Sequence, residues 1–137
     1  MSEKTRTKPR PTEAELEILQ VLWNEGPSTV RAVHEALVST KATGYTTTLK
    51  LMQKMADKGL VTRDESRRSH VYTAAMEAEK TQRQLVQHLL HGAFGGAPGR
   101  MVMQALSENP ATEEELAEIR QLLDELEHNK RNGETAK

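Results

Sequence analysis

The run from Gly44 to Gly59 constrains the fold of this chain more than any other stretch. Its apolar residues recur at the spacing of one helix face, which predicts a single amphipathic helix packed against a core. The apolar face consists of Leu49, Met52, Met55 and Ala56. Gly59 is expected to end this helix in a left-handed conformation, which glycine adopts without strain. The extended run that begins at Leu60 then predicts a strand directly after the helix.

The opposite face of this helix carries hydroxyl, amide and cationic side chains. Threonine hydroxyls favour helix starts, so the three threonines are expected in the first turn. A first turn also presents free backbone N–H groups and the positive end of the helix dipole, and both suit a phosphate. This surface indicates DNA recognition, although a solvated helix with incidental threonines is the alternative from this stretch alone. The candidate DNA contacts are Tyr45, Thr46, Thr47, Thr48, Lys50 and Lys54.

Two further helices are predicted before this one. Thr12–Glu15 has the form of a capping box, which predicts a first helix that runs to about Glu25. A Gly-Pro pair ends that helix, and Ser28 is expected to cap a second helix that runs to about Ser39. The apolar positions expected to face the core are Leu16, Ile18, Leu19, Leu22, Trp23, Val30, Val33 and Leu37. The polar residues at the start of the second helix are candidate contacts to the DNA backbone. They are Ser28, Thr29 and Arg31.

A change from a helical to an alternating pattern predicts a β-hairpin over residues 60–73. Its polar tip carries Arg67 and Arg68. Three helices followed by a hairpin form the winged-helix arrangement, in which the cations of the wing are expected to lie along a phosphate backbone or enter a minor groove. Taken by themselves, the two arginines also fit an ordinary solvated turn.

Residues 76–128 differ in kind, because they predict three helices with apolar faces and no strand. A break at Phe94–Gly99 separates the first two helices, and a second capping box at Thr112–Glu115 opens the last one. No sheet within the chain is left to cover these faces, so dimerisation is the simplest way to bury them. The expected dimer contacts are Leu85, Leu89, Met101, Val102, Leu106, Leu116, Ile119, Leu122, Leu123 and Leu126.

The predicted fold class is therefore mainly α with a small β-hairpin. We expect a disordered basic arm over residues 1–11, a winged-helix DNA-binding domain over 12–75, a helical dimerisation region over 76–128 and a disordered tail over 129–137. The net charge is only −1, but residues 1–72 carry 12 Lys and Arg against 9 Asp and Glu, and residues 73–137 carry 7 against 11. This asymmetry is expected when only the first part of a chain faces phosphate.

Several classes of protein are disfavoured by composition. The chain has no cysteine, which excludes disulfides, thiol catalysis and cysteine-ligated metals. Its first eleven residues are basic and lack an apolar segment, so we expect neither a signal peptide nor a membrane anchor, and a cytoplasmic location. No Ser-His-Asp set, phosphate loop or pair of catalytic carboxylates stands out, so we expect no enzyme activity and no cofactor.

Several short motifs occur in a specific order and spacing. They are Ala14–Leu19 with Leu22, Trp23 and Gly26; Tyr45–Leu49; Lys58–Val61 with Arg63; Arg68, His70 and Tyr72; and Phe94–Gly96. On these motifs, residues 12 to about 127 resemble the BlaI/MecI/CopY family of bacterial repressors. The resemblance implies a homodimer that represses transcription at an inverted-repeat DNA operator. It places the family's DNA-contacting threonine pair on Thr46 and Thr47, and its wing arginine on Arg68, with Arg67 where many relatives have glycine.

The same resemblance suggests two kinds of inducing signal. Copper-responsive members use C-terminal cysteines, which this chain lacks. Members that respond to β-lactams are cleaved at an Asn-Phe bond, which by register falls on Gln104-Ala105. The dipeptide is not kept, so the sequence does not support this cleavage, although a regulatory protease stays an open partner.

Two other functions remain open from the sequence. The first is a winged helix that binds another protein through its threonine face, since such a surface also suits protein association. The second is a metal-responsive regulator, because the i, i+3 spacing of His88 and His91 on a helix could bring two imidazoles together. Partly exposed histidines without a metal are the simpler interpretation, and no metal site is predicted.

Overall fold

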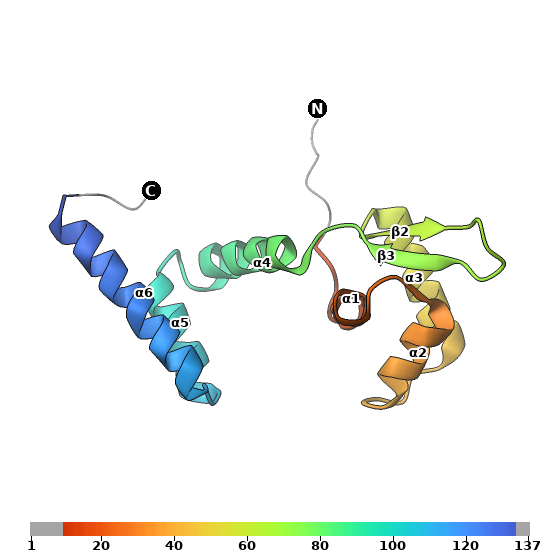
Figure 1. The fold of residues 1–137 in the computed structure, drawn as a ribbon, viewed down its shortest axis with the longest axis horizontal. Helices are drawn as coiled ribbons and strands as arrows, with labels where there is room; N and C mark the ends of the chain where they lie inside the picture. Colours follow the sequence, from red (N-terminus) through yellow and green to blue (C-terminus); the bar gives the residue numbers. More distant parts are fainter. Residues whose placement is uncertain (1–9, 134–137) are drawn as a thin grey trace. The chain divides into compact units, whose positions relative to one another are not determined.

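The computed structural model describes residues 10–133 (Figure 1). Its elements in chain order are α1 (Glu13–Glu25), β1 (Ser28–Thr29), α2 (Val30–Val38), α3 (Tyr45–Lys58), β2 (Val61–Asp64), β3 (Val71–Ala74), α4 (Ala78–Ala93), α5 (Pro98–Glu108) and α6 (Glu113–Arg131). The chain forms two compact units that divide between residues 88 and 89, within α4. The basic arm predicted over residues 1–11 lies almost entirely outside the described residues, as does the end of the predicted tail.

Both predicted capping boxes are present at the starts of their helices. At α1, Thr12 Oγ1 accepts from the Glu15 N–H at 3.2 Å, and the Glu15 carboxylate accepts from the Thr12 N–H at 2.9 Å. At α6, Thr112 and Glu115 make the same pair of bonds, each at 3.0 Å. Each box satisfies two backbone donors that a helix start leaves unpaired, so local sequence is sufficient to fix where these helices begin.

The start of α2 differs from the prediction. Thr29, and not Ser28, is the capping residue, and its Oγ1 accepts from the Ala32 N–H at 3.1 Å. Ser28 lies instead in β1, where its side chain is buried and its Oγ donates to the carbonyl of Gly26 at 2.8 Å. The shift occurs because the two residues before α2 extend to pair with β3, which moves the first helical residue to Val30.

The sheet has three strands, one more than the predicted hairpin supplies. Its order is β1-β3-β2, and both pairs of neighbours are antiparallel. β1 places Ser28 opposite Tyr72, while β2 places Asp64 opposite Val71. The third strand therefore ties the start of α2 to the first half of β3. We call the hairpin formed by β2, β3 and the residues 65–70 between them the wing; β2 and β3 are labelled in Figure 1.

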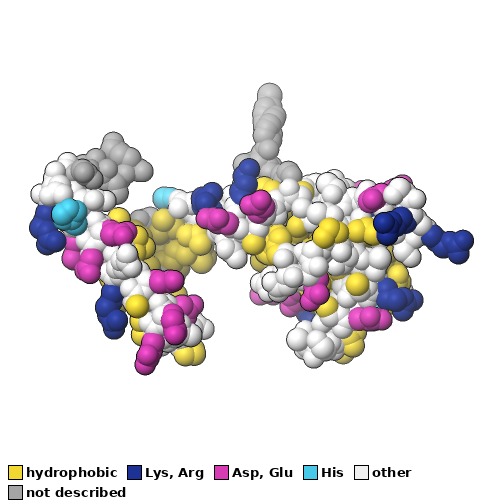
Figure 2. Space-filling view, viewed as in Figure 1, with side chains coloured by type: hydrophobic (Ala, Val, Ile, Leu, Met, Phe, Trp, Pro, Cys, Tyr) yellow, Lys and Arg dark blue, Asp and Glu magenta, His cyan; other side chains and the backbone are white. Residues whose placement is uncertain are grey.

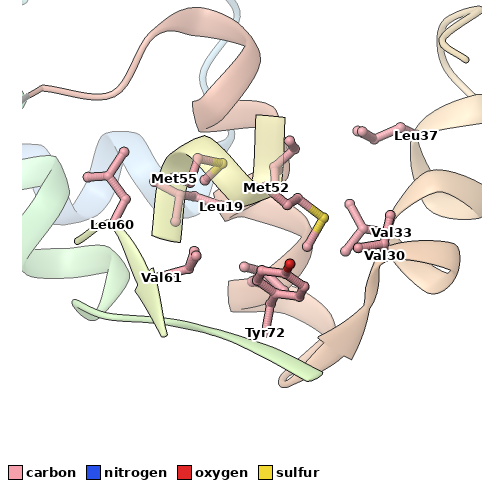
Figure 3. Packing of buried hydrophobic residues seen from close by; sticks show 11 residues of the cluster. Leu19, Val30, Val33, Leu37, Met52, Met55, Leu60, Val61 and Tyr72 are labelled. Carbon is pink, nitrogen blue, oxygen red and sulfur yellow. The ribbon is translucent and has the colours of Figure 1, made fainter. Parts of the chain in front are cut away.

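The core of the first unit lies between the three helices and the sheet. Figure 3 shows Met52 of α3 extending toward Tyr72 of β3, with Val30 and Val33 of α2 beside it. Trp23 lies at the edge of this core, where its Nε1 donates to the carbonyl of Met76 at 2.9 Å. The buried apolar residues are Ile18, Leu19, Leu22, Val30, Val33, Leu37, Met52, Met55, Leu60, Val61 and Tyr72. This packing fixes the orientation of α3, because its apolar face contacts both other helices and the sheet.

An ion pair joins the start of α1 to the end of α3. The Lys58 Nζ donates to both carboxylate oxygens of Glu15, at 2.9 and 2.8 Å, and Glu15 is only 1% exposed. Burial of Glu15 disfavours its ionised form, but hydrogen bonds from Lys58 and from Thr12 outweigh this effect, so the pKa of the carboxyl lies below its ordinary value. Glu15 thus caps its own helix and also holds the last turn of α3. Gly59 follows with φ of +83°, as predicted for the residue that ends this helix.

The second unit contains the end of α4 together with α5 and α6. Apolar side chains remain exposed on all three of these helices, and Figure 2 shows hydrophobic groups gathered on one side of this unit. α6 continues to Arg131, three residues beyond the end predicted for the helical region. Within residues 10–133, no helix combines the length and the apolar character needed to cross a membrane.

Candidate nucleic-acid interface

The first turn of α3 presents polar groups to solvent. Tyr45, Thr46 and Thr47 are exposed, and so are Lys50 and Lys54 one and two turns later. Among the described residues, no side chain caps this helix at Gly44, so its first backbone N–H groups have no side-chain acceptor. Free N–H groups, hydroxyls and cations on one surface match what the sequence predicted for an anionic ligand.

Thr48 does not belong to this surface. Its side chain is 0% exposed, and its Oγ1 donates to the carbonyl of Gly44 at 3.4 Å. The reason is helical spacing, since Thr48, Met52 and Met55 stand at i, i+4 and i+7 and therefore share the inner face. Thr48 and Ser28 were both predicted as DNA contacts, but both are buried in this structure and neither belongs to the exposed surface. The position of Thr48 relative to Met52 would have indicated this from the sequence.

A recess of about 450 Å³ lies where the start of α2, the outer face of α3 and the wing meet. It brings together four of the predicted contacts, namely Thr29, Arg31, Tyr45 and Arg68. Sequence reasoning did not assign the other polar residues that line it, which are Gln53, Ser69 and His70. The apolar residues at the recess are Val30, Leu49 and Tyr72. The predicted residues from three separate elements thus converge on one hollow.

Tyr45 contacts two side chains of α2. The Arg31 guanidinium carbon lies 5.4 Å from the centroid of the Tyr45 ring, which is the geometry of a cation–π contact. The His34 ring meets the Tyr45 ring edge to face, with centroids 5.7 Å apart and an angle of 82° between the planes. The Nδ1 atom of His34 is buried and has no hydrogen-bond partner within the described part of the chain. His34 was missed from the sequence because nothing local connects it to Tyr45.

The tip of the wing is shaped by its own side chains. Asp64 accepts from the Ser66 N–H at 2.9 Å, and this bond lowers the pKa of the exposed Asp64 carboxyl. Arg63 forms an ion pair with Glu65 at 2.7 Å. Arg67 and Arg68 are both exposed, and Figure 2 shows cationic side chains projecting at this end of the first unit. Of these two residues, only Arg68 lines the recess.

The histidines of α4 show no arrangement that indicates a metal. Arg10 Nη1 donates to His88 Nε2 at 2.6 Å, so one nitrogen of that ring is already engaged. Within residues 10–133, no group of three or more His, Cys, Asp or Glu side chains is placed to hold an ion. The metal-responsive alternative therefore gains no support from this structure.

Three helices packed on a three-stranded antiparallel sheet with a wing define a winged-helix protein, which confirms the predicted fold class. Residues 11–125 match the model of the family described as penicillinase repressor. The chain therefore belongs to the penicillinase repressor family, as the resemblance in its motifs predicted.

Two sequence relatives agree with this assignment. The chain is 24% identical over 123 residues to the penicillinase repressor of Bacillus licheniformis, an alignment that covers 90% of this chain and 96% of that protein. It is 39% identical over 56 residues to the transcriptional regulator BlaI of Mycobacterium tuberculosis, where the alignment spans 40% of this chain and 41% of the relative. A solved structure, the transcriptional regulator Tm0710 from Thermotoga maritima, is 18% identical and covers 91% of this chain and 80% of its own, with a TM-score of 0.48.

Proposed function

We propose that this chain is a transcriptional repressor that binds an inverted-repeat DNA operator as a homodimer and acts in the cytoplasm. The observation that carries the proposal is the surface at the start of α3. There the exposed hydroxyls of Thr46 and Thr47 stand beside uncapped backbone N–H groups, and cations flank them on α2, α3 and the wing. Membership of the penicillinase repressor family supports the same function.

The chemistry of each group suits a distinct part of a DNA duplex. In a major groove, a threonine hydroxyl can hydrogen-bond to the polar edge of a base, and its methyl group can contact a thymine methyl. The ammonium groups of Lys50 and Lys54 would contact phosphates, which fix the register of the protein without reading sequence. We therefore assign Thr46 and Thr47 to base recognition and the lysines to the backbone.

Homodimer formation is proposed from the second unit. Large apolar side chains remain exposed along its helices, which is typical of a surface that pairs with another chain. The predicted dimer contacts that are exposed in the single chain are Leu89, Val102, Leu106, Leu122, Leu123 and Leu126. The half-buried ones are Leu85, Met101, Leu116 and Ile119. A second copy would cover these groups, and a two-fold dimer would present two α3 helices to two half-sites.

The variant Thr47→Ala tests the assignment of α3. It is expected to weaken binding to the DNA upstream of the protein's own gene by about tenfold, because one base-edge contact per half-site is lost. Binding to random-sequence duplex should change by less than about twofold, since phosphate contacts are kept. Fluorescence anisotropy with both duplexes measures the two affinities. Thr73→Ala, which alters an exposed threonine of β3, is the matched control.

Two results would speak against this proposal. If Thr47→Ala weakens binding to both duplexes equally, Thr47 does not recognise a base. Failure of the wild-type chain to bind any duplex, together with a salt-insensitive complex with another protein, would favour the protein-association alternative. The sequence does not identify the inducing signal. A regulatory protease stays an untested proposal, and Gln104 and Ala105 are both exposed on α5.

A further inference from the structure

We propose that Tyr45 positions Arg31, and that Arg31 and Arg68 together bind one phosphate of the DNA backbone in the recess between α2, α3 and the wing. This inference rests on the proposed function, which supplies the DNA. The place of Tyr45 beside Thr46 and Thr47 suggests a direct contact to DNA. The inference instead gives Tyr45 the role of positioning Arg31. Tyr45 acts through Arg31 and does not need to contact a base.

The Tyr45 ring contacts both Arg31 and His34 of α2. The Arg31 guanidinium carbon lies 5.4 Å from the centroid of the Tyr45 ring, and the His34 ring packs against the same tyrosine edge to face. His34 and Arg31 are one turn apart on α2, so they hold the tyrosine from the same helix. Tyr45 is still 39% exposed. The two contacts orient the ring, and the ring can in turn limit the rotamers of the Arg31 side chain, which otherwise loses much entropy on binding.

The positive charges of Arg31 and Arg68 are not neutralised by carboxylates of the described chain. Within residues 10–133, Arg63 and Arg83 each form an ion pair with a glutamate, at 2.7 and 3.3 Å, whereas neither Arg31 nor Arg68 has a carboxylate partner. Arg31 comes from α2 and Arg68 from the wing, and both line the same recess. Two guanidinium groups without a carboxylate partner, both lining one recess, make that recess a positively charged site that favours an anion.

The side chains that line the recess suit a phosphate. Thr29 and Ser69 add hydroxyl groups to its lining, and Gln53 adds an amide. No carboxylate is among the residues that line it. Its volume of about 450 Å³ accommodates a phosphodiester group with its flanking sugar carbons. Hydroxyls, an amide and guanidinium groups are the side chains that proteins use most often for contacts to DNA phosphates.

Salt dependence of binding to a short, fluorescein-labelled duplex of random sequence tests this inference, because only backbone contacts contribute there. The variants are Arg31→Ala, Tyr45→Leu, Tyr45→Phe and the double variant Arg31→Ala with Tyr45→Leu, all in the full chain. Arg68→Ala tests the contribution of the wing to the recess. Arg83→Ala, which removes one positive charge from α4 away from the recess, is the control for net charge.

The expected results follow from the loss of one phosphate contact. Arg31→Ala and Arg68→Ala should each lower the slope of log affinity against log salt by about one per protomer. Tyr45→Leu should weaken binding by about two- to fivefold and lower the slope, and Tyr45→Phe should restore both, because the ring face is kept. The double variant should bind no more weakly than Arg31→Ala. The control variant Arg83→Ala should retain more of the slope than Arg31→Ala.

Three outcomes would overturn the inference. The first is an unchanged salt slope for Tyr45→Leu, which would leave the tyrosine with a structural role only. The second is additive losses in the double variant, which would mean that Tyr45 contacts DNA independently of Arg31. The third is a loss of slope for Arg68→Ala no larger than the loss for Arg83→Ala. If the wild-type chain binds no duplex at all, the proposed function fails as well, so the two failures are distinguishable.

Discussion

Replacing Leu122 and Leu126 together by aspartate is expected to convert the chain from a dimer to a monomer. These leucines stand one turn apart on α6 and are 54% and 45% exposed in the single chain. A carboxylate at a buried dimer contact is unpaired, and its desolvation costs more free energy than the interface gains there. Sedimentation velocity of the wild-type and variant chains measures the change directly.

The same double variant is expected to weaken operator binding by more than about a hundredfold. In a dimer, the second half-site is bound at a high effective concentration, which typically raises the apparent affinity by about 10² to 10⁴. A monomer loses this gain while its α3 surface stays intact. Binding of one protomer to random-sequence duplex should therefore change far less than binding to the operator.

A matched control separates this effect from added negative charge. Gln121→Asp combined with Asn129→Asp introduces the same two carboxylates at exposed polar positions of α6. This control should stay dimeric and should bind the operator within about twofold of the wild type, since exposed substitutions rarely shift stability by more than about 0.5 kcal/mol. A leucine variant that stays dimeric, or a wild-type chain that is monomeric, would contradict the dimer assignment.

The variant Glu15→Ala is expected to lower the free energy of unfolding of the first unit by about 2–3 kcal/mol, because it breaks a largely buried ion pair and a helix cap. The estimate is below the full value for a buried pair, since Lys58 keeps 24% of its side chain in contact with solvent. Urea titration followed by the fluorescence of Trp23, the single tryptophan, measures the change. Glu15→Gln should lower the free energy of unfolding by less than Glu15→Ala, because its amide oxygen can still accept from the Thr12 N–H.

Glu17 offers the matched control on the same helix. It pairs with Lys41 at 3.1 Å, but both side chains are exposed, so Glu17→Gln should cost less than about 1 kcal/mol. If Glu17→Gln destabilises the protein as much as Glu15→Gln, burial is not what gives the Glu15 pair its effect.

The ion pair also predicts a dependence on pH. The pKa of Glu15 is lowered in the folded protein, so its contribution to stability is complete above the pKa of an unfolded glutamate, about 4.3. The contribution is then lost as the pH falls through the lower pKa of the folded state. Wild-type protein should therefore lose more stability than Glu15→Gln between about pH 5 and pH 3. If the free energy of unfolding falls equally for the two proteins over this pH range, the ionised Glu15 carboxylate does not contribute to stability as proposed.

Local signals in the sequence predicted the helices of the first unit well. The capping box at Thr12 and the left-handed Gly59 depend on neighbours within a few residues, and both occur as expected. β1 could not be found this way, because a strand of two residues has no periodicity and forms only by pairing with Val71 and Tyr72. The capping of α2 by Thr29 follows from the same pairing.

The candidate site was predicted in composition but not in geometry. Thr46, Thr47, Lys50 and Lys54 are exposed on α3 as the helical pattern predicted. The contact between Arg31 and Tyr45 depends on how α2 packs on α3, and the Glu15–Lys58 pair joins residues 43 positions apart. No local pattern reports such contacts. The burial of Thr48 is different, since its spacing from Met52 and Met55 already placed it on the inner face.

The most direct test of the account is selection of duplexes by the full-length chain from a pool of random sequences. If two copies each place the start of α3 in a major groove, the enriched duplexes will share a two-fold symmetric motif. Its half-sites will lie about 10 base pairs, or a multiple of that spacing, apart from centre to centre. When Thr47→Ala selects duplexes from the same pool, the preference for particular bases will weaken at defined positions of the motif. Enrichment of no motif, or of the same motif by wild-type protein and Thr47→Ala, would contradict the account.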